Sequence, residues 1–371
     1  MKNILIIQES LNGGGAEKVL IELLNNIDYS KYQITLLLVY YNGRYIKQVN
    51  DNVTIKYIYK NKRPSIKRIL ARTPIIDFIE KFEINRVLGN SRFDTIISFM
   101  EGITLKYHSH IMNKSLLNIS WVHVNLIVNP WSTKIFRNIK NEKNIYKKLD
   151  KIVFVSEKVK DAFKQKFQIS APEEKVLYNI INREKIQALS NEKIIDKRCF
   201  TICNVGRLAP IKKQDRLIKA VKLLIEKKCN IELWILGEGK EYNRLQSLIS
   251  NLRLNQEVHL LGFKSNPYPY IKAADVFVLS SDTEGYPTVV CEALCLGKPI
   301  ITTRITGCTE LLGNNNFGIL TDLNEEAIAN AIYDLYNSKD KTNYFKQKAL
   351  ERANYFNVEY AINEFYKVID K

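Results

Sequence analysis

The sequence predicts an α/β protein made of two doubly wound domains in tandem. Short apolar runs of strand length alternate with helical patterns along the chain, and a polar segment near its middle separates two such series. The 371 residues also exceed what one hydrophobic core usually serves. We therefore expect a first domain at 1–190, a second at 191–350, and a closing helix within 351–371 that could return to the first domain.

The first domain is expected to hold a parallel sheet. Apolar runs predict its strands at 4–8, 34–39, 53–58, 95–99, 116–121 and 151–155. Helical patterns between them cover 16–26, 66–88, 133–148 and 158–167. Alternation of strands and helices with short connections is typical of a sheet whose strands all run the same way.

The second domain repeats this pattern after a polar segment at 181–197. Its strands are expected at 200–205, 231–236, 258–261, 276–279 and 300–303, and its helices at 215–227, 240–252, 287–296 and 325–336. Ligands of such sheets bind beyond the carboxyl ends of the strands. With two facing domains, we expect the ligand site in the cleft between them.

Composition excludes several classes of protein. No apolar stretch approaches the roughly 18 residues of a membrane-spanning helix, and the apolar run near the N-terminus is too short for a signal peptide. The six cysteines include no CxxC pair and the four histidines are scattered, so we expect no metal site. These observations predict a cytoplasmic protein.

The net charge of +17 is concentrated in residues 1–195, which hold 32 Lys and Arg against 18 Asp and Glu. Two basic blocks account for much of it. The first comprises Lys56, Lys60, Lys62, Arg63, Lys67, Arg68 and Arg72, and the second Lys134, Arg137, Lys140, Lys143, Lys147, Lys148 and Lys151. Such blocks attract nucleic acid or an anionic membrane surface, and a merely solvated basic face is the alternative.

One strand–turn–helix unit of the second domain carries two glutamates suited to ligand binding. Glu284 falls in the turn after the strand, and Glu292 lies in the helix that is expected to begin at Pro287. The free N–H groups of the helix start, around 286–289, lie between the two acids and suit a phosphate group. This order fits a nucleotide sugar, which has hydroxyls at both ends and phosphate in the middle. The alternative is a pair of ordinary surface acids near a helix start.

Two loops supply further candidates. Gly14 and Gly15 belong to a run of three glycines that leads from the first strand into a helix, where the missing side chains let a ligand approach the backbone. Arg207 and Lys212 follow the first strand of the second domain, and two cations there can neutralise a diphosphate. A flexible turn and a solvated basic loop are the respective alternatives.

Together these motifs resemble those of glycosyltransferase family 4, whose members are retaining enzymes of the GT-B fold. The matches follow the family's order along nearly the whole chain and are strongest over 200–320. They are Gly14-Gly15-Ala16-Glu17, Gly206-Arg207-Leu208 with Lys212, Glu284 and Glu292 at E-x7-E spacing, 154–157, 176–179, 236–239, Gly262 with Phe263, and Gly307 with Glu310. The resemblance implies two Rossmann-like domains facing across a cleft, the first binding the acceptor and the second the nucleotide sugar.

The resemblance also implies roles for individual residues. Glu284, with the backbone of Gly285 and Tyr286, would hold hydroxyls of the donor sugar, and Glu292 would bind the ribose hydroxyls. The cations would stabilise the charge that grows on the leaving nucleoside diphosphate. Catalytic roles thus fall to Glu284, Arg207, Lys212 and His123, and further substrate contacts to Gly14, Gly15, Thr288, Val289, Gly262 and Phe263, the last two beside the nucleobase.

His123 follows the fifth strand of the first domain, where similar enzymes often place a histidine near the donor sugar. A lone histidine is more often structural than catalytic. The acid that frequently follows in relatives is Val124 here, which leaves a general-base role open. Lys213 stands where relatives commonly have a glycine. The resemblance implies no divalent metal and no cofactor, since cationic side chains would carry the charge and the nucleotide sugar is a substrate.

The resulting prediction is a retaining hexosyltransferase. It would move a hexose or N-acetylhexosamine from a UDP-sugar to a hydroxyl of a lipid-linked oligosaccharide or lipopolysaccharide acceptor, in surface polysaccharide biosynthesis. The basic first domain predicts a peripheral location at the inner face of the cell membrane. Two alternatives are a nucleotide-sugar epimerase of similar fold and a basic nucleic-acid-binding protein; the latter lacks a recognition motif, so no nucleic-acid partner is expected.

Overall fold

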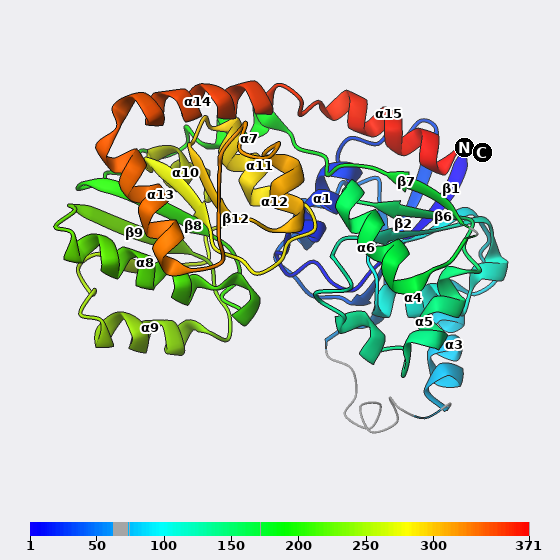
Figure 1. Cartoon of the computed structure of the whole chain (residues 1–371). Helices are drawn as coiled ribbons and strands as arrows, with labels where there is room; N and C mark the ends of the chain where they lie inside the picture. Colours follow the sequence, from blue (N-terminus) through cyan, green and yellow to red (C-terminus); the bar gives the residue numbers. More distant parts are fainter. Residues whose placement is uncertain (62–72, 74, 171, 371) are drawn as a thin grey trace. The chain divides into compact units, whose positions relative to one another are not determined.

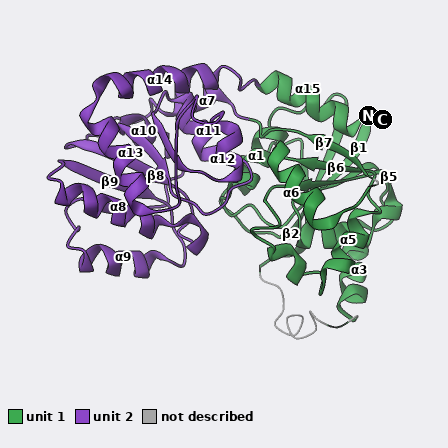
Figure 2. Ribbon diagram, in the orientation of Figure 1, with its two compact units in different colours: residues 1–180, 358–371 green, residues 181–357 purple. Residues whose placement is uncertain are grey.

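The chain folds into two compact units, residues 1–180 with 358–371 and residues 181–357, which we call unit 1 and unit 2 (Figure 1, Figure 2). The structure is a computed structural model that describes residues 1–61, 73, 75–170 and 172–370. The first boundary lies earlier than the expected 190, and the second lies later than the expected 350. Of the first basic block, Lys62, Arg63, Lys67, Arg68 and Arg72 lie outside the described residues.

Unit 1 is built on a seven-stranded parallel sheet with the order β3-β2-β1-β4-β5-β6-β7. The strands are β1 (Lys2–Gln8), β2 (Tyr32–Tyr40), β3 (Thr54–Tyr59), β4 (Phe93–Ser98), β5 (Ser115–Val122), β6 (Lys151–Phe154) and β7 (Glu173–Val176). The helices are α1 (Gly15–Leu24), α3 (Ile75–Leu88), α4 (Ile103–Ser109), α5 (Ile139–Tyr146), α6 (Glu157–Phe167) and α15 (Val358–Ile369), with short 3₁₀ turns η1 (Ile46–Gln48), η2 (Met112–Lys114) and η3 (Trp131–Lys134). The central strands β1, β4 and β5 are mostly buried and mostly apolar, as expected when helices cover both faces of a parallel sheet.

Unit 2 repeats this plan with a six-stranded parallel sheet of order β10-β9-β8-β11-β12-β13. Its strands are β8 (Phe200–Val205), β9 (Ile231–Leu236), β10 (Val258–Gly262), β11 (Val276–Leu279), β12 (Ile300–Thr303) and β13 (Ile319–Thr321). Its helices are α7 (Arg183–Leu189), α8 (Gln214–Glu226), α9 (Tyr242–Asn251), α10 (Tyr268–Ala273), α11 (Thr288–Cys295), α12 (Thr306–Leu311), α13 (Glu325–Asn337) and α14 (Lys339–Ala353), and η4 spans Pro210–Lys212. In each sheet the strand order reverses beside the first strand, which is where ligands of doubly wound sheets bind.

The C-terminal helix α15 belongs to unit 1 although it follows unit 2 in the chain (Figure 1). The carboxylate of Asp370 accepts from Lys2 Nζ at 2.7 Å and from the Tyr32 hydroxyl at 2.9 Å. Phe365 packs beside Trp121 of β5, with ring centroids 6.1 Å apart. These contacts tie the two ends of the chain to the same sheet.

Several expected elements differ from those observed. The helix expected at 133–148 is broken into η3 and α5, because Arg137 takes a left-handed φ of 68° and Asn138 then caps α5 by accepting from the Asn141 N–H. The helix expected to begin at Pro287 begins at Thr288, with Pro287 as its N-cap. Elements not expected from the sequence are β7, β13, α4, α7, α10, α12 and α14.

Candidate active site

The candidate site in unit 2 lies where β8 and β11 end side by side. These strands are neighbours in the sheet, and the strand order reverses between them. The loop after β8 carries Arg207 and Lys212, and the turn after β11 carries Glu284. Because both segments leave the carboxyl edge of one sheet, residues far apart in the sequence are brought together there.

Lys212 and Glu284 form an ion pair at this edge, with Nζ and Oε1 2.5 Å apart. The same carboxylate oxygen accepts from the Ser281 hydroxyl at 2.7 Å. The side chains of Lys212 and Glu284 are 26% and 14% exposed, so the pair is partly sheltered yet reachable from solvent. A charged hydrogen bond of this kind is stronger than a fully exposed one.

Backbone contacts fix the loop that carries Lys212 against the end of β11. The Ser280 hydroxyl is within 3.1 Å of the Lys212 carbonyl oxygen and 2.9 Å of the Lys213 carbonyl oxygen. The Asp282 N–H donates to the Ile211 carbonyl at 2.9 Å. Lys213 adopts a left-handed φ of 50°, the conformation that favours glycine. This explains why a glycine suits the position and shows that lysine takes the same turn.

A second ion pair that the sequence did not single out supports the turn. Arg216, at the start of α8, donates to the Ser280 carbonyl and to Asp282 Oδ1, each at 2.8 Å. Arg216 therefore fixes residues 280 and 282, which lie shortly before Glu284 in the chain. The only signal in the sequence was an additional cation after the basic loop and an acid two residues before Glu284.

Gly307, at the start of α12, packs directly against the turn. Its N–H donates to the Glu284 carbonyl at 3.2 Å. A Cβ at this position would lie 2.3 Å from the Gly285 carbonyl oxygen, which is closer than real contacts allow. The close approach requires glycine and fixes the backbone of Gly285.

The other sequence-predicted residues of unit 2 lie in α11, in the turn before it and at the end of β10. Glu292 is 4% exposed within α11, while Thr288 and Val289 are half-buried in its first turn, and Gly285 and Tyr286 are buried before it. Gly262 ends β10 with a φ of 69° and accepts from the Gly237 N–H at 2.8 Å, and Phe263, next to it, is half-buried.

Arg207 is exposed, and its backbone rather than its side chain is fixed. Its carbonyl accepts from Gln214 Nε2 at 3.1 Å. The residues on either side are packed tightly, since a Cβ at Gly237 would lie 1.9 Å from the Gly206 carbonyl oxygen and one at Gly239 would lie 2.1 Å from the Leu208 carbonyl oxygen. A fixed backbone with an exposed guanidinium suits the binding of an anion from solution.

In unit 1 the glycine loop after β1 is organised by its own helix. The N–H groups of Gly13 and Gly14 both donate to the Glu17 carboxylate, the first at 2.8 Å. Gly15 is the first residue of α1. The N–H of Gly14, which the sequence suggested for substrate, is therefore occupied by a capping carboxylate in this structure.

His123 directly follows β5 and is 8% exposed. Burial lowers its pKa to about 4, and a hydrogen bond with the Phe99 backbone acts in the opposite direction. A hydrogen bond raises the pKa in this way when a ring N–H of the histidine donates to a carbonyl. Its Nε2 has no hydrogen-bond partner among the described residues, which leaves a buried, unprotonated nitrogen able to accept from a hydroxyl.

Glu101 holds His123 in place and was missed in the sequence. One of its oxygens accepts from the His123 backbone N–H at 2.9 Å, and the other accepts from Trp131 Nε1 at 3.2 Å. The side chain is fully buried, and burial raises the pKa of this carboxyl. A lone acid between a strand and a helix gives no periodic signal, although an acid beside a glycine just after a predicted strand was a usable hint.

The comparisons with known proteins identify the family. The family model described as glycosyl transferases group 1 matches residues 185–352. A glycosyltransferase of Methanocaldococcus jannaschii is 30% identical over 87% of this chain and 89% of its own length. The chain belongs to the group 1 glycosyltransferases.

Two further comparisons concern the fold and a relative with a named activity. The crystal structure of HepE from Anabaena in complex with UDP and glucose has a TM-score of 0.79 at 19% identity, over 100% of both chains. This glycosyltransferase therefore has the GT-B fold. The Campylobacter jejuni N-acetylgalactosamine-N,N'-diacetylbacillosaminyl-diphospho-undecaprenol 4-alpha-N-acetylgalactosaminyltransferase is 28% identical over 96% of this chain and 96% of its own.

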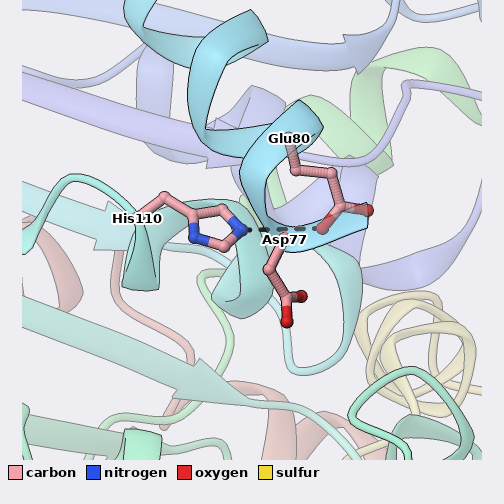
Figure 3. A group of neighbouring side chains, drawn as sticks. All are labelled: Asp77, Glu80 and His110. Atoms are coloured by element: carbon pink, nitrogen blue, oxygen red, sulfur yellow. Dashed lines mark ion pairs between the residues drawn. The ribbon is translucent and has the colours of Figure 1, made fainter. Parts of the chain in front are cut away.

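One group of side chains in the described part of the glycosyltransferase has the spacing of metal ligands, namely Asp77, Glu80 and His110 (Figure 3). The ammonium of Lys106 lies within it, 3.0 Å from Glu80 Oε2 and 3.4 Å from Asp77 Oδ1. His110 Nε2 is 3.5 Å from the same Glu80 oxygen. A lysine ammonium already supplies the positive charge that these carboxylates require, so the group is an ion-pair network of unit 1 rather than a metal centre.

Proposed function

We propose that this glycosyltransferase is a retaining family 4 enzyme that transfers a hexose or N-acetylhexosamine from a UDP-sugar to an acceptor hydroxyl. The observation that carries the proposal is the Lys212–Glu284 ion pair at the point of unit 2 where the strand order reverses. It combines a cation for the diphosphate with a carboxylate for sugar hydroxyls on a backbone that Ser280 and Gly307 hold in place. The UDP complex of HepE supports a nucleotide-sugar donor.

The donor contacts follow from the chemistry of each residue. Glu284 and the backbone of Gly285 and Tyr286 bind hydroxyls of the sugar, and Glu292 binds those of the ribose. Arg207, which is exposed, closes on the diphosphate together with Lys212. The amides of Thr288 and Val289 lie in the first turn of α11, where the positive end of the helix dipole favours phosphate; Gly262 and Phe263 border the base.

The reaction proceeds on one face of the sugar. The bond from the anomeric carbon to the diphosphate oxygen breaks, the acceptor oxygen attacks from the same side, and its proton passes to the departing phosphate. Lys212 and Arg207 neutralise the negative charge that grows on the diphosphate, an interaction stronger in the transition state than in the ground state. Because cationic side chains do this, neither a divalent metal nor a cofactor is required.

From unit 1, we assign Gly14, Gly15 and His123 to substrate binding. Gly14 offers its N–H only when the Glu17 carboxylate moves away, so Glu17 competes with a bound anion for this loop. His123 accepts a hydrogen bond from a sugar hydroxyl through Nε2. A pKa of about 4 makes it a weak base at neutral pH, so this role is one of positioning.

The acceptor is proposed to be a lipid-linked oligosaccharide or a lipopolysaccharide at the inner face of the cell membrane, in surface polysaccharide biosynthesis. The Campylobacter relative, whose name specifies a diphospho-undecaprenol substrate, supports this class. None of the helices that the structure describes combines the length and apolarity needed to cross a bilayer. A peripheral association through basic surface is therefore part of the proposal.

The test is a screen of UDP-sugars that measures UDP release with and without undecaprenyl-diphosphate-linked saccharides. We expect acceptor-dependent UDP release and, by NMR, a product with the anomeric configuration of the donor. Lys212→Ala should lower the rate of release by about a hundredfold or more. Lys222→Ala, which removes a lysine of α8 outside the site, should retain it. An inverted product would refute retention, and sugar interconversion without acceptor would favour an epimerase.

A further inference from the structure

Helix α3 of unit 1 turns its acidic residues inward. Glu80 is fully buried and contacts Lys106. It also contacts His110 (Figure 3). Glu83 is 8% exposed and accepts from the hydroxyl of Tyr59. Asp77 is half-buried between Lys106 and the guanidinium of Arg137. All three acids of the helix are thus engaged with side chains of unit 1.

The same helix turns apolar side chains outward. Ile75, Phe78 and Phe82 are 57%, 75% and 63% exposed. Their spacing of three and four residues places them on one face of the helix. Lys81 and Arg86 are also exposed, so the outward surface combines aromatic and basic side chains. We call these five residues the α3 face.

Helix α3 buries Ile76, Ile84 and Leu88 as an ordinary surface helix would, but it also buries acids and leaves a second set of apolar side chains exposed. An ordinary surface helix buries its apolar stripe and exposes its charges, because burial of apolar area is the main source of its stability. Here the carboxylates are taken out of water at a desolvation cost that ion pairs offset, and two phenylalanines remain in water. Folding of unit 1 alone gives no reason to expose them, so the face is suited to another surface.

Helix α5 and the segment before it also expose basic side chains. Arg137, through its contact with Asp77, links α3 to the segment that leads into α5. In α5 Ile139 is 45% exposed, and Lys140 is exposed in the same turn. Apolar and basic side chains therefore occur together on both helices.

We propose that the α3 face binds an anionic lipid bilayer, with Phe78 and Phe82 inserted among the headgroups and Lys81 and Arg86 at the phosphates. Long basic side chains beside an apolar stripe can keep their charges in the interface while their stems cover apolar surface. A second copy of the chain is disfavoured, because a two-fold contact would bring the same cations together. The choice of a bilayer rests on the lipid-linked acceptor proposed above, whereas the exposed face is independent of it.

The first experiment measures sedimentation of the full-length protein with vesicles of phosphatidylcholine alone or with 30% phosphatidylglycerol, in ~0.1 M salt. We expect binding to the anionic vesicles and a loss of about tenfold or more in Phe78→Ser/Phe82→Ser. The matched control is Ile194→Ser/Leu323→Ser, which removes two exposed apolar side chains of unit 2 and should bind like wild type.

The second experiment tests the cations. Lys81→Glu/Arg86→Glu should weaken binding to anionic vesicles by about tenfold or more and reduce its dependence on salt. Lys193→Glu/Lys339→Glu makes the same charge change at two exposed residues of unit 2 and should have a much smaller effect. All variants should keep the stabilisation of unit 2 by UDP in a thermal unfolding assay.

The outcomes separate this inference from the proposed function. Wild-type vesicle binding by Phe78→Ser/Phe82→Ser would overturn the α3 face as the binding surface. If the wild type does not bind vesicles but forms a dimer, and Phe78→Ser/Phe82→Ser abolishes that dimer, the face binds a second copy instead. If UDP stabilises the wild type but the protein does not bind vesicles, the inference fails while the donor assignment stands. If UDP does not stabilise the wild type, that result counts against the donor assignment alone.

Discussion

Lys212 Nζ and Glu284 Oε1, from residues 72 positions apart in the chain, lie 2.5 Å from each other. The lysine belongs to the loop after β8 and the glutamate to the turn after β11, and these two strands are paired in the sheet. The ion pair therefore depends only on the fold of unit 2. A cation and a carboxylate that are already in contact need little rearrangement to bind the two ends of a sugar diphosphate, which is the advantage of a preorganised site.

Removing either partner of this pair should reduce turnover strongly. Glu284→Gln and Lys212→Ala should each lower kcat by about a hundredfold or more, the loss seen when one transition-state stabiliser is removed. Initial rates of UDP release, with thermal unfolding to verify folding, check this. Lys222→Ala is the control, and near wild-type turnover in either site variant would refute the assignment.

Replacing Gly307 should displace the turn that carries Glu284. The new Cβ would meet the Gly285 carbonyl at 2.3 Å, so Gly307→Ala should cost roughly 1–3 kcal/mol of unfolding free energy and raise the KM for the donor. Gly206→Ala, where a Cβ would meet nothing within 4 Å, should leave the unfolding free energy unchanged. Equal stability of both variants, measured by urea unfolding, would contradict the packing argument.

The left-handed turn at Lys213 should be strained by its side chain. Lys213→Gly is expected to stabilise unit 2 by about 0.5–1 kcal/mol, because glycine adopts a φ of 50° without the clash at Cβ. The Lys213–Asp282 contact of 3.5 Å is partly exposed and offsets little of this gain. In the control Lys222→Gly, within α8, glycine should instead destabilise by about 1 kcal/mol. Destabilisation by Lys213→Gly would show that the ion pair matters more than the strain.

Two buried histidines should make unit 1 less stable in mild acid. Burial lowers the pKa of His108 and of His123 to about 4, whereas an unfolded histidine titrates near 6.5. Between these values the unfolded chain binds protons that the folded chain does not, so the unfolding free energy falls as pH decreases from about 6.5 to about 4. Each histidine contributes a slope of about 1.4 kcal/mol per pH unit.

The variant His108→Gln tests this slope. It removes one titrating group and should flatten the pH dependence by about one histidine's contribution, whatever its effect on stability at pH 7. Urea unfolding of unit 1 at several pH values provides the measurement. An unchanged slope would mean that His108 is protonated in the folded protein despite its burial, which lowers its pKa.

The stability of unit 1 should depend on the carboxyl oxygens of Glu101 as hydrogen-bond acceptors and much less on its charge. Its pKa is raised by burial, so ionisation is costly, and Glu101→Gln keeps an acceptor for the His123 N–H or the Trp131 indole. Glu101→Ala leaves both donors buried without a partner and should cost about 2–4 kcal/mol. Similar stability of the two variants would indicate that water replaces the carboxylate.

Some elements could be predicted to the residue, and the reasons are physical. The strands β8, β9, β11 and β12 are apolar runs buried on both faces, and they have the expected bounds. The strand β7 reads Glu-Glu-Lys-Val at a sheet edge, where charge hides the strand pattern, and β13 has three residues. The break at Arg137 depends on a backbone conformation that an arginine rarely adopts.

In the candidate site, too, some features could be predicted from the sequence and others could not. The spacing of Glu284 and Glu292 placed both on one strand–turn–helix unit, which the structure contains. The partners of that unit could not be read from the chain: the contact of Glu284 with Lys212 and the support from Gly307 depend on strand order. Glu101 belongs to no periodic pattern, and its partners, a backbone N–H and an indole, could not be foreseen from its position after a strand.

The contacts of α15 also bear on how this protein can be rearranged. Lys2 and Asp370 are bonded at 2.7 Å, so the first and last parts of the chain are neighbours on unit 1 (Figure 1). A short linker could join these ends, and new ends could be opened between 357 and 358. The permuted chain would make unit 1 from one uninterrupted segment followed by unit 2. Each unit could then be expressed and titrated separately, unit 2 with UDP and unit 1 with lipid vesicles.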